Sequence, residues 1–280
     1  MEKLAASFAR NLYIIPGGYF LVQIIRKLFE SNYLKPEWRT FKFRGISMRV
    51  DISKSMGAAI YWRGAHDWAP IFVLEDIIKQ GDTVIDVGAN QGEYSLWAAK
   101  NTGPSGTVLA FEPMDELYVQ LKKNFALNPK YRNTLIPNKN GLSDKPGKLN
   151  LFGKAGDNEG VNTMFPTQSH TVLIQEINLD TLDNQLNKLK CEKVNFIKID
   201  VEGAELHVLK GARETLNKYK PSLLIEINSE ACLAGGYEPE EIFEILRPLG
   251  YKFEKIGLRG KRIPVDKVPK EFCNILASVR

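Results

Sequence analysis

The 280-residue sequence is poor in cysteine and has no long uninterrupted apolar run. Its three cysteines, Cys191, Cys232 and Cys273, are widely spaced, and the sequence has no CxxC or HxxxH motif beside them. Neither a zinc site nor a disulfide framework is therefore indicated. Sparse cysteine of this kind favours a reducing, cytoplasmic setting. No stretch reaches the roughly 18 apolar residues that a membrane-spanning helix requires. We therefore expect a cytoplasmic protein without a transmembrane helix.

The most apolar segment, 12–25, contains one proline and two glycines and is not followed by the small-residue pattern of a signal-peptide cleavage site. Arg10 precedes it, and Arg26 and Lys27 follow it. Three interpretations remain open: a helix at a membrane interface, a contact in a homo-oligomer, or a helix packed on the rest of the chain. A peripheral membrane contact through residues 1–30 is therefore one of the alternatives.

An excess of positive over negative charge is found only in the N-terminal part of the chain. The net charge is +5, but residues 1–65 contain 11 Lys and Arg against 4 Asp and Glu, a local +7 that leaves −2 for the remainder. A basic segment of this kind suits an anionic lipid, a phosphorylated sugar carrier or nucleic acid, although a solvated surface is the commoner explanation. The charge excess thus belongs to the N-terminal extension.

Strand and helix patterns alternate along most of the sequence. Residues 1–65 predict an N-terminal extension with a helix over 1–30 and a β-hairpin that turns at Gly45, and residues 66–280 predict a single α/β domain. The expected strands are 83–87, 108–111, 134–137, 194–199 and 223–227, the expected helices 71–79, 115–127, 204–216 and 239–246, and the final antiparallel pair 251–256 and 272–279. This order predicts a doubly wound, mostly parallel sheet that ends in an antiparallel strand.

An insertion is expected between the third and fourth core strands, where a helix would be usual. Residues 148–152 and 171–179 have strand composition, and the stretch between them is polar and rich in Gly and Asn. Ligands of open α/β sheets bind beyond the carboxyl ends of the strands. We therefore expect a hairpin and loop that cover the substrate.

The turn after the first core strand, Asp86-Val-Gly-Ala-Asn-Gln-Gly92, is the strand-to-helix turn that nucleotide cofactors use. A dinucleotide site requires G-x-G-x-x-G, but Asn90 and Glu93 occupy its second and third glycine positions. The Asn90 side chain would crowd a diphosphate, and the Glu93 carboxylate would repel it. S-adenosylmethionine has no phosphate, and its amino acid end suits Asp86, Asn90 and nearby backbone groups.

Two further acidic positions complete this pattern. Glu112 follows Gly88 by 24 positions, a spacing that suits a carboxylate binding both ribose hydroxyls. The segment 195–205 places Asp200, Glu202 and Glu205 at a strand end and helix start. Helix capping explains Glu205 equally well, whereas Asp200 at the mouth of a central strand is the stronger functional candidate.

The motifs DVGANQGEYS, FEP, GLSD followed by Gly147, and IKIDVEGAE together resemble the FkbM family of methyltransferases over residues 60–280. The resemblance implies the class I methyltransferase (Rossmann-like) fold, S-adenosylmethionine as donor, and methyl transfer to a hydroxyl of a sugar, polyketide or other metabolite. It implies that the methionine part is held by Asp86, Gly88, Asn90, Gly92 and Ser95, the ribose by Glu112 with the adjacent Pro113, and the adenine by Ser143 and Asp144. Asp200, Glu202 and Glu205 would face the methyl group and the acceptor.

An alcohol acceptor loses a proton during the transfer, so a base is required. We expect Asp200 or Glu202 in this role, helped by His66 or His207. Many relatives carry an aromatic residue and Glu before the first strand, where this chain has His66 and Asp67, which leaves the acceptor open. A divalent metal held by Asp200 with Glu226 or Asn228 is a less favoured alternative.

Two other function classes remain as alternatives. The basic extension, together with Arg259, Lys261 and Arg262, is compatible with a nucleic-acid methyltransferase, but the sequence has no aromatic-plus-basic recognition module, so no nucleic-acid partner is expected. A chain that kept the fold as a membrane or partner adaptor would not bind S-adenosylmethionine. The intact donor motifs favour the enzyme, acting on a small-molecule or glycan acceptor.

Overall fold

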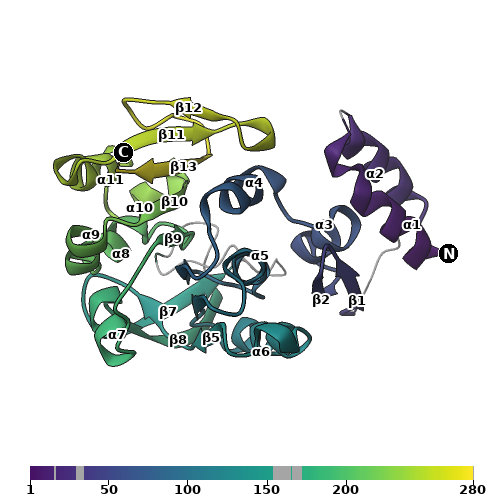
Figure 1. The fold of residues 1–280 in the computed structure, drawn as a ribbon, viewed down its shortest axis with the longest axis horizontal. Helices are drawn as coiled ribbons and strands as arrows, with labels where there is room; N and C mark the ends of the chain where they lie inside the picture. Colours follow the sequence, from purple (N-terminus) through teal and green to yellow (C-terminus); the bar gives the residue numbers. More distant parts are fainter. Residues whose placement is uncertain (16, 30–34, 154–164, 166–171, 280) are drawn as a thin grey trace.

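The computed structural model describes residues 1–15, 17–29, 35–153, 165 and 172–279, and its centre is an eight-stranded sheet of order β12-β11-β13-β10-β9-β3-β4-β5 (Figure 1). These strands are β3 (Thr83–Val87), β4 (Thr107–Phe111), β5 (Leu135–Asn138), β9 (Phe196–Ile199), β10 (Ser222–Ile227), β11 (Lys252–Ile256), β12 (Arg262–Pro264) and β13 (Cys273–Ser278). The pairs among β10, β9, β3, β4 and β5 are parallel, and β13 lies antiparallel between β10 and β11. The expected doubly wound sheet with an antiparallel last strand is confirmed.

Two hydrophobic clusters cover the two faces of this sheet, because successive strand residues point to opposite sides. In β3, Val84 belongs to one cluster and Ile85 to the other. The helices of the first face include α4 (Trp68–Ile77), α5 (Glu93–Thr102) and α6 (Asp115–Ala126). The second face carries α7 (Leu182–Lys188), α8 (Glu205–Lys210), α9 (Arg213–Tyr219), α10 (Ser229–Ala234) and α11 (Glu240–Leu246).

The N-terminal part comprises α1 (Glu2–Ala9), a 3₁₀ turn (Arg10–Ile14), α2 (Gly18–Lys27), β1 (Trp38–Phe43), β2 (Ile46–Asp51) and α3 (Ser55–Arg63), and it lies at one end of the molecule (Figure 1). The β1–β2 hairpin turns through Arg44 and Gly45, both with positive φ, as a two-residue hairpin turn requires. Its buried residues continue into the cluster on the first face of the sheet. The proposed boundary at residue 65 therefore divides the sequence but not the hydrophobic core.

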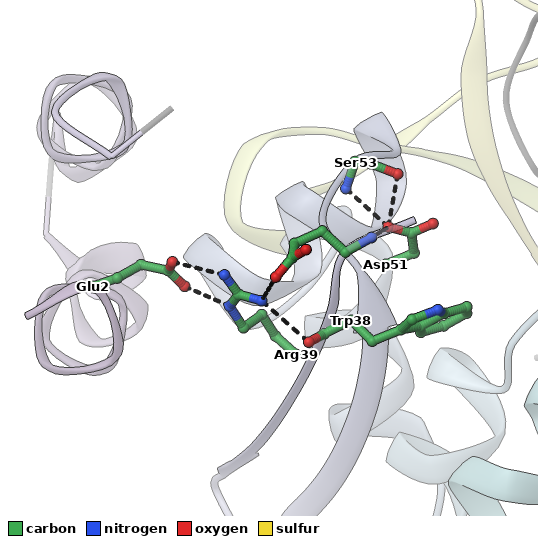
Figure 2. A network of polar contacts seen from close by, with 6 residues as sticks. Glu2, Trp38, Arg39, Asp51 and Ser53 are labelled. Carbon is green, nitrogen blue, oxygen red and sulfur yellow. Dashed lines mark hydrogen bonds and ion pairs between the residues drawn. The ribbon is translucent and has the colours of Figure 1, made fainter. Parts of the chain in front are cut away.

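Figure 2 shows how α1 is tied to the hairpin. The Arg39 guanidinium donates to both carboxylate oxygens of Glu2, at 2.8 and 3.0 Å, and to the side chain of Glu37. The Asp51 carboxylate accepts hydrogen bonds from Ser53 and from the backbone N–H of Glu37. The side of α1 that carries Glu2 therefore faces the protein.

A separate three-stranded sheet of order β6-β8-β7 contains the expected inserted hairpin. It consists of β6 (Gly141–Leu142), β7 (Gly147–Gly153) and β8 (Val172–Asp180), with β7 and β8 antiparallel. The polar loop expected between the two strands lies outside the described residues. Leu151, Ile177 and Leu179 of this sheet pack on Met114 and Leu117, at the start of α6.

Two local expectations were wrong. A single helix was expected over 204–216, but the chain forms α8 and α9, which are separated at Gly211. A Cβ atom at Gly211 would lie 2.0 Å from the carbonyl oxygen of Ser143, so only glycine fits at this position between the two helices. The insertion was also expected to replace a helix, yet α7 follows it. Helix α7 is capped by the Thr181 hydroxyl, which accepts a hydrogen bond from the Asn184 N–H.

In the described part of the chain, no helix has the length and apolarity needed to cross a membrane.

Candidate functional site

A cavity of about 340 Å³ opens at the carboxyl ends of β3, β4, β9 and β10. Its volume falls in the range of roughly 300–1,000 Å³ typical of small-molecule sites. The lining comes from the turn after β3, the residues after β4, the end of β9 and its following loop, the end of β10, the inserted sheet, and the start of α3. The position is the one at which open α/β sheets bind their ligands.

The turn after β3 approaches the end of β9 very closely. Gly88 has a φ of +77°, and a Cβ atom built on it would lie 1.9 Å from the carbonyl oxygen of Asp200. Asn90 also has a positive φ, of 51°, a conformation that asparagine tolerates better than most residues. Gly88 and Asn90 both line the cavity. Gly92 does not line it, because it packs against Leu121 and Phe125.

Asp86 lies beneath the cavity, not in its wall. Its buried carboxylate accepts a hydrogen bond of 2.5 Å from the Ser95 hydroxyl, and its Oδ1 accepts no hydrogen bond from the described residues but lies 3.5 Å from the Lys198 ammonium. The side-chain nitrogen of Gln91, which does line the cavity, is also buried and unpartnered in the described part of the chain. Unpartnered polar atoms around a cavity are uncommon in protein interiors and fit a polar ligand group.

Lys198 was not expected from the sequence and is central to the site. It lies in the buried strand β9, and its Nζ is 3.0 Å from the Gly88 carbonyl oxygen, 3.1 Å from Asp200 Oδ2 and 3.5 Å from Asp86 Oδ1. Burial disfavours the ammonium, but the neighbouring carboxylates of Asp200 and Asp86 raise the pKa of Lys198 well above its ordinary value. A lysine within a fully buried strand was the signal in the sequence that could have identified it.

Two further carboxyl groups in the cavity wall are largely removed from water. Burial raises the pKa of Glu112 to about 7, against backbone hydrogen bonds from Met114 and Asn90 that lower it. Burial likewise raises the pKa of Glu93 to about 8, although its carboxylate accepts the backbone N–H of His66. Raised carboxyl pKa values of this kind concentrate at functional sites.

Three acidic side chains meet at the ends of β9 and β10. Asp200, Glu202 and Glu226 each offer an oxygen within 4.8 Å of those of the other two, and all three line the cavity. Burial raises the pKa of Glu226 to about 9, and the Asp200 charge adds to this effect. Glu226 is therefore protonated at neutral pH, beside an Asp200 that is paired with Lys198.

Glu205 does not line the cavity but fixes the loop that does. Its buried carboxylate accepts the backbone N–H groups of Val201 and Gly203, at 3.1–3.3 Å, and the Tyr237 hydroxyl at 2.6 Å. The loop holds Glu202 at a φ of 47°, which is unusual for this residue type. The Glu205 carboxylate thus stabilises a strained turn and has no direct access to a bound ligand.

The remaining predicted residues divide into two groups. His66 and Pro113 line the cavity, as does Asp67, which caps α4. Ser143, Asp144, His207 and Asn228 do not line it. His207 lies 3.9 Å from Asp144 and contacts the Gly235 carbonyl oxygen, while Asn228 caps α10. The residue that lies beside Asp200 and Glu226 is therefore Glu202, and not the weaker metal candidate Asn228.

The opposite end of the cavity is apolar. Met114 and Leu117 of the α6 start, Leu142 of β6, Leu151 of β7 and Ile177 of β8 form this wall. The inserted sheet therefore closes the cavity beside the end of β4, which Glu112 directly follows, whereas the acidic groups lie beside β9 and β10. An apolar slot next to a carboxyl group, with a polar end beyond it, matches the order of base, ribose and amino acid in a nucleoside such as S-adenosylmethionine.

Comparisons with known proteins identify related methyltransferases. Residues 86–253 match the model of the methyltransferase FkbM domain. The hexuronic acid methyltransferase AglP of Haloferax volcanii is 28% identical over 184 residues, 66% of this chain and 68% of that protein. The methyltransferase sdnD of Sordaria araneosa is 30% identical over 158 residues, 47% of this chain and 60% of that protein. The crystal structure of a methyltransferase FkbM from Methylobacillus flagellatus superposes with a TM-score of 0.47 and 16% identity, over 78% of this chain and 52% of that one.

Proposed function

The chain belongs to the FkbM family of S-adenosylmethionine-dependent methyltransferases, and from this premise we propose that it methylates a hydroxyl group of a sugar or glycan. The observation that carries the proposal is the acidic group at one end of the cavity, Asp200, Glu202 and Glu226. These carboxyl groups suit the hydroxyls of a sugar, because they accept hydrogen bonds from them. The hexuronic acid methyltransferase AglP, similar over two thirds of both chains, adds support for a carbohydrate acceptor.

In this proposal the donor and the acceptor bind at different ends of the cavity. Glu112, beside the apolar slot, would accept the ribose hydroxyls of the donor, and the turn at Gly88 and Asn90 with the buried Gln91 amide would bind its amino acid part. S-adenosylmethionine supplies a methyl group bonded to a positively charged sulfur. The acceptor oxygen attacks the methyl carbon in line with the carbon–sulfur bond and displaces the sulfur. Much of the catalysis can therefore be positioning of the two partners.

Asp200 would take the proton that the acceptor hydroxyl loses as the oxygen–methyl bond forms. Its carboxylate lies in the cavity wall and pairs with the Lys198 ammonium, 3.1 Å away. The protonated Glu226 can donate a hydrogen bond to Asp200 or to the acceptor and so orient it. Lys198 also supplies positive charge at the acidic group, so the transfer as proposed needs no metal ion.

The acceptor class is tested by incubating the protein with methyl-labelled S-adenosylmethionine and a panel of sugar nucleotides, glycolipids and free glycans. We expect label in a carbohydrate fraction, bound through an ether that survives mild base. Mild base removes methyl esters, so ester-bound label would place the methyl group on a carboxylate and contradict the hydroxyl proposal. Label only in added RNA or DNA would contradict the carbohydrate class.

The affinity for S-adenosylmethionine is expected to rise with pH because of Glu112. Its pKa of about 7 lies above the ordinary carboxyl value, so the ionised form that accepts both ribose hydroxyls becomes populated only as pH rises through 7. Titration calorimetry should show an affinity gain of about fivefold to tenfold between pH 6 and pH 8. The Glu112→Gln variant should bind more weakly and lose this dependence. An unchanged pH dependence in the variant would remove Glu112 from the ribose site.

A further inference from the structure

Helix α2 is apolar on two opposite sides. Val22 is buried, and Ile25 and Phe29, on the same side, pack against the core. On the other side Phe20, Ile24 and Leu28 are 72%, 60% and 76% exposed. Residues spaced by four lie in one stripe along a helix, so the exposed side chains form a continuous apolar face. A soluble surface helix normally carries polar residues at such positions.

Helix α1 repeats this arrangement. Leu4 and Phe8, again four positions apart, are 78% and 63% exposed. They lie on the side of the helix away from Glu2, whose carboxylate is held against the hairpin by Arg39 (Figure 2). Because α1 and α2 form the outer end of the molecule beyond α3, neither exposed side faces the rest of the chain (Figure 1).

The charge next to these helices is positive. Lys3 on α1 and Lys27 on α2 are exposed. The acidic residues of this region that the structure describes are already engaged: Glu2 and Glu37 by Arg39, and the buried Asp51 by Ser53 and a backbone N–H. A basic rim beside exposed Phe and Leu side chains is the pattern of helices that lie in the interface of an anionic membrane.

We propose that α1 and α2 dock the enzyme on an anionic lipid surface through a docking face made of Leu4, Phe8, Phe20, Ile24 and Leu28 with Lys3 and Lys27. A second copy of the chain is a poorer occupant, because a two-fold contact would bring the same basic side chains together without acidic partners. The docking face lies on the helices that pack against α3, whose first residues, Ser55 and Met56, line the cavity. Docking would therefore place on the membrane surface the helices that pack against one wall of the cavity.

Vesicle flotation with the full chain tests the docking face, using vesicles of phosphatidylcholine alone or mixed with phosphatidylglycerol. We expect flotation with the mixed vesicles and little with the neutral ones. The Phe20→Ser/Ile24→Ser variant should lower partitioning by about tenfold or more, and Lys3→Glu/Lys27→Glu should lower it chiefly at low salt. Leu258→Ser, which changes another highly exposed leucine, should float as the wild type does.

The outcomes separate the occupants. A wild type that does not float, or a Phe20→Ser/Ile24→Ser variant that floats like it, would overturn the proposal. Sedimentation equilibrium that gives a dimer, abolished by the same variant, would assign the face to a second copy. Circular dichroism melting confirms that the variants are folded. The vesicles carry no acceptor and the assay needs no turnover, so its failure leaves the proposed methyl transfer unaffected.

Discussion

An Asp200→Asn variant is expected to bind S-adenosylmethionine but to lose turnover, with kcat about 10²–10⁴-fold lower. The reason is that Asn cannot take the proton of the acceptor hydroxyl, while its size and position in the cavity wall are those of Asp200. The Lys198 ammonium, 3.1 Å from the carboxylate, would retain Asp86 as a partner at 3.5 Å, so the change should not unfold the site. Donor binding by calorimetry and single-turnover methylation of the acceptor identified by labelling measure the two properties separately.

Glu226→Gln is the matched control for this variant. Since the pKa of Glu226 is about 9, the residue is protonated near neutral pH, and the neutral Gln reproduces its charge and much of its hydrogen bonding. We expect kcat to fall by less than about tenfold at pH 7.5. If Glu226→Gln were as inactive as Asp200→Asn, the base would be the carboxyl pair and not Asp200 alone. Wild-type turnover in Asp200→Asn would exclude Asp200 from the proton transfer.

Lys198→Met is expected to lower the free energy of unfolding by about 3–5 kcal/mol, the range for removing one partner of a buried ion pair. Met keeps the length and the apolar stem of lysine, so the loss arises from charge and not from a cavity. Without the ammonium, Asp86 remains buried beside Ser95 with no cation, and the Gly88 carbonyl oxygen loses its donor. Denaturant unfolding followed by fluorescence gives the difference directly.

Lys188→Met provides the comparison. Lys188 also pairs with an aspartate, Asp180, at 2.6 Å, but its side chain is largely exposed. The buried Asp180 carboxylate keeps its hydrogen bonds from Thr181, Asn184 and Gln185, so loss of the exposed ammonium should cost only about 0–1 kcal/mol. The donor affinity should fall only in Lys198→Met, because only that lysine supports the turn at Gly88. Equal stability losses in the two variants would mean that the buried pair has no special role.

The sequence by itself determined the sheet and the turn after β3. Strands such as β3 and β10 are short, mostly apolar runs between turn residues, and this local pattern is sufficient to place them within a residue or two. The turn of Gly88 and Asn90 was equally visible, because it requires unusual backbone conformations that few residue types allow. The ends of β3, β4 and β9 then necessarily meet at one edge, which brings Asp200 and Glu112 to a common cavity.

Only the tertiary structure decided which acidic groups reach that cavity and in what state. Asp200, Glu202 and Glu205 lie within six residues of one sequence motif, yet the first two line the cavity and Glu205 is turned toward its own loop and Tyr237. The pairing of Lys198 with Asp86 and Asp200 joins residues 112 and 2 positions away. The exposure of the outer sides of α1 and α2 likewise depends on what packs against each helix. Distances between residues remote in sequence, and the burial that shifts their pKa values, are properties of the folded chain and are not encoded in any local pattern.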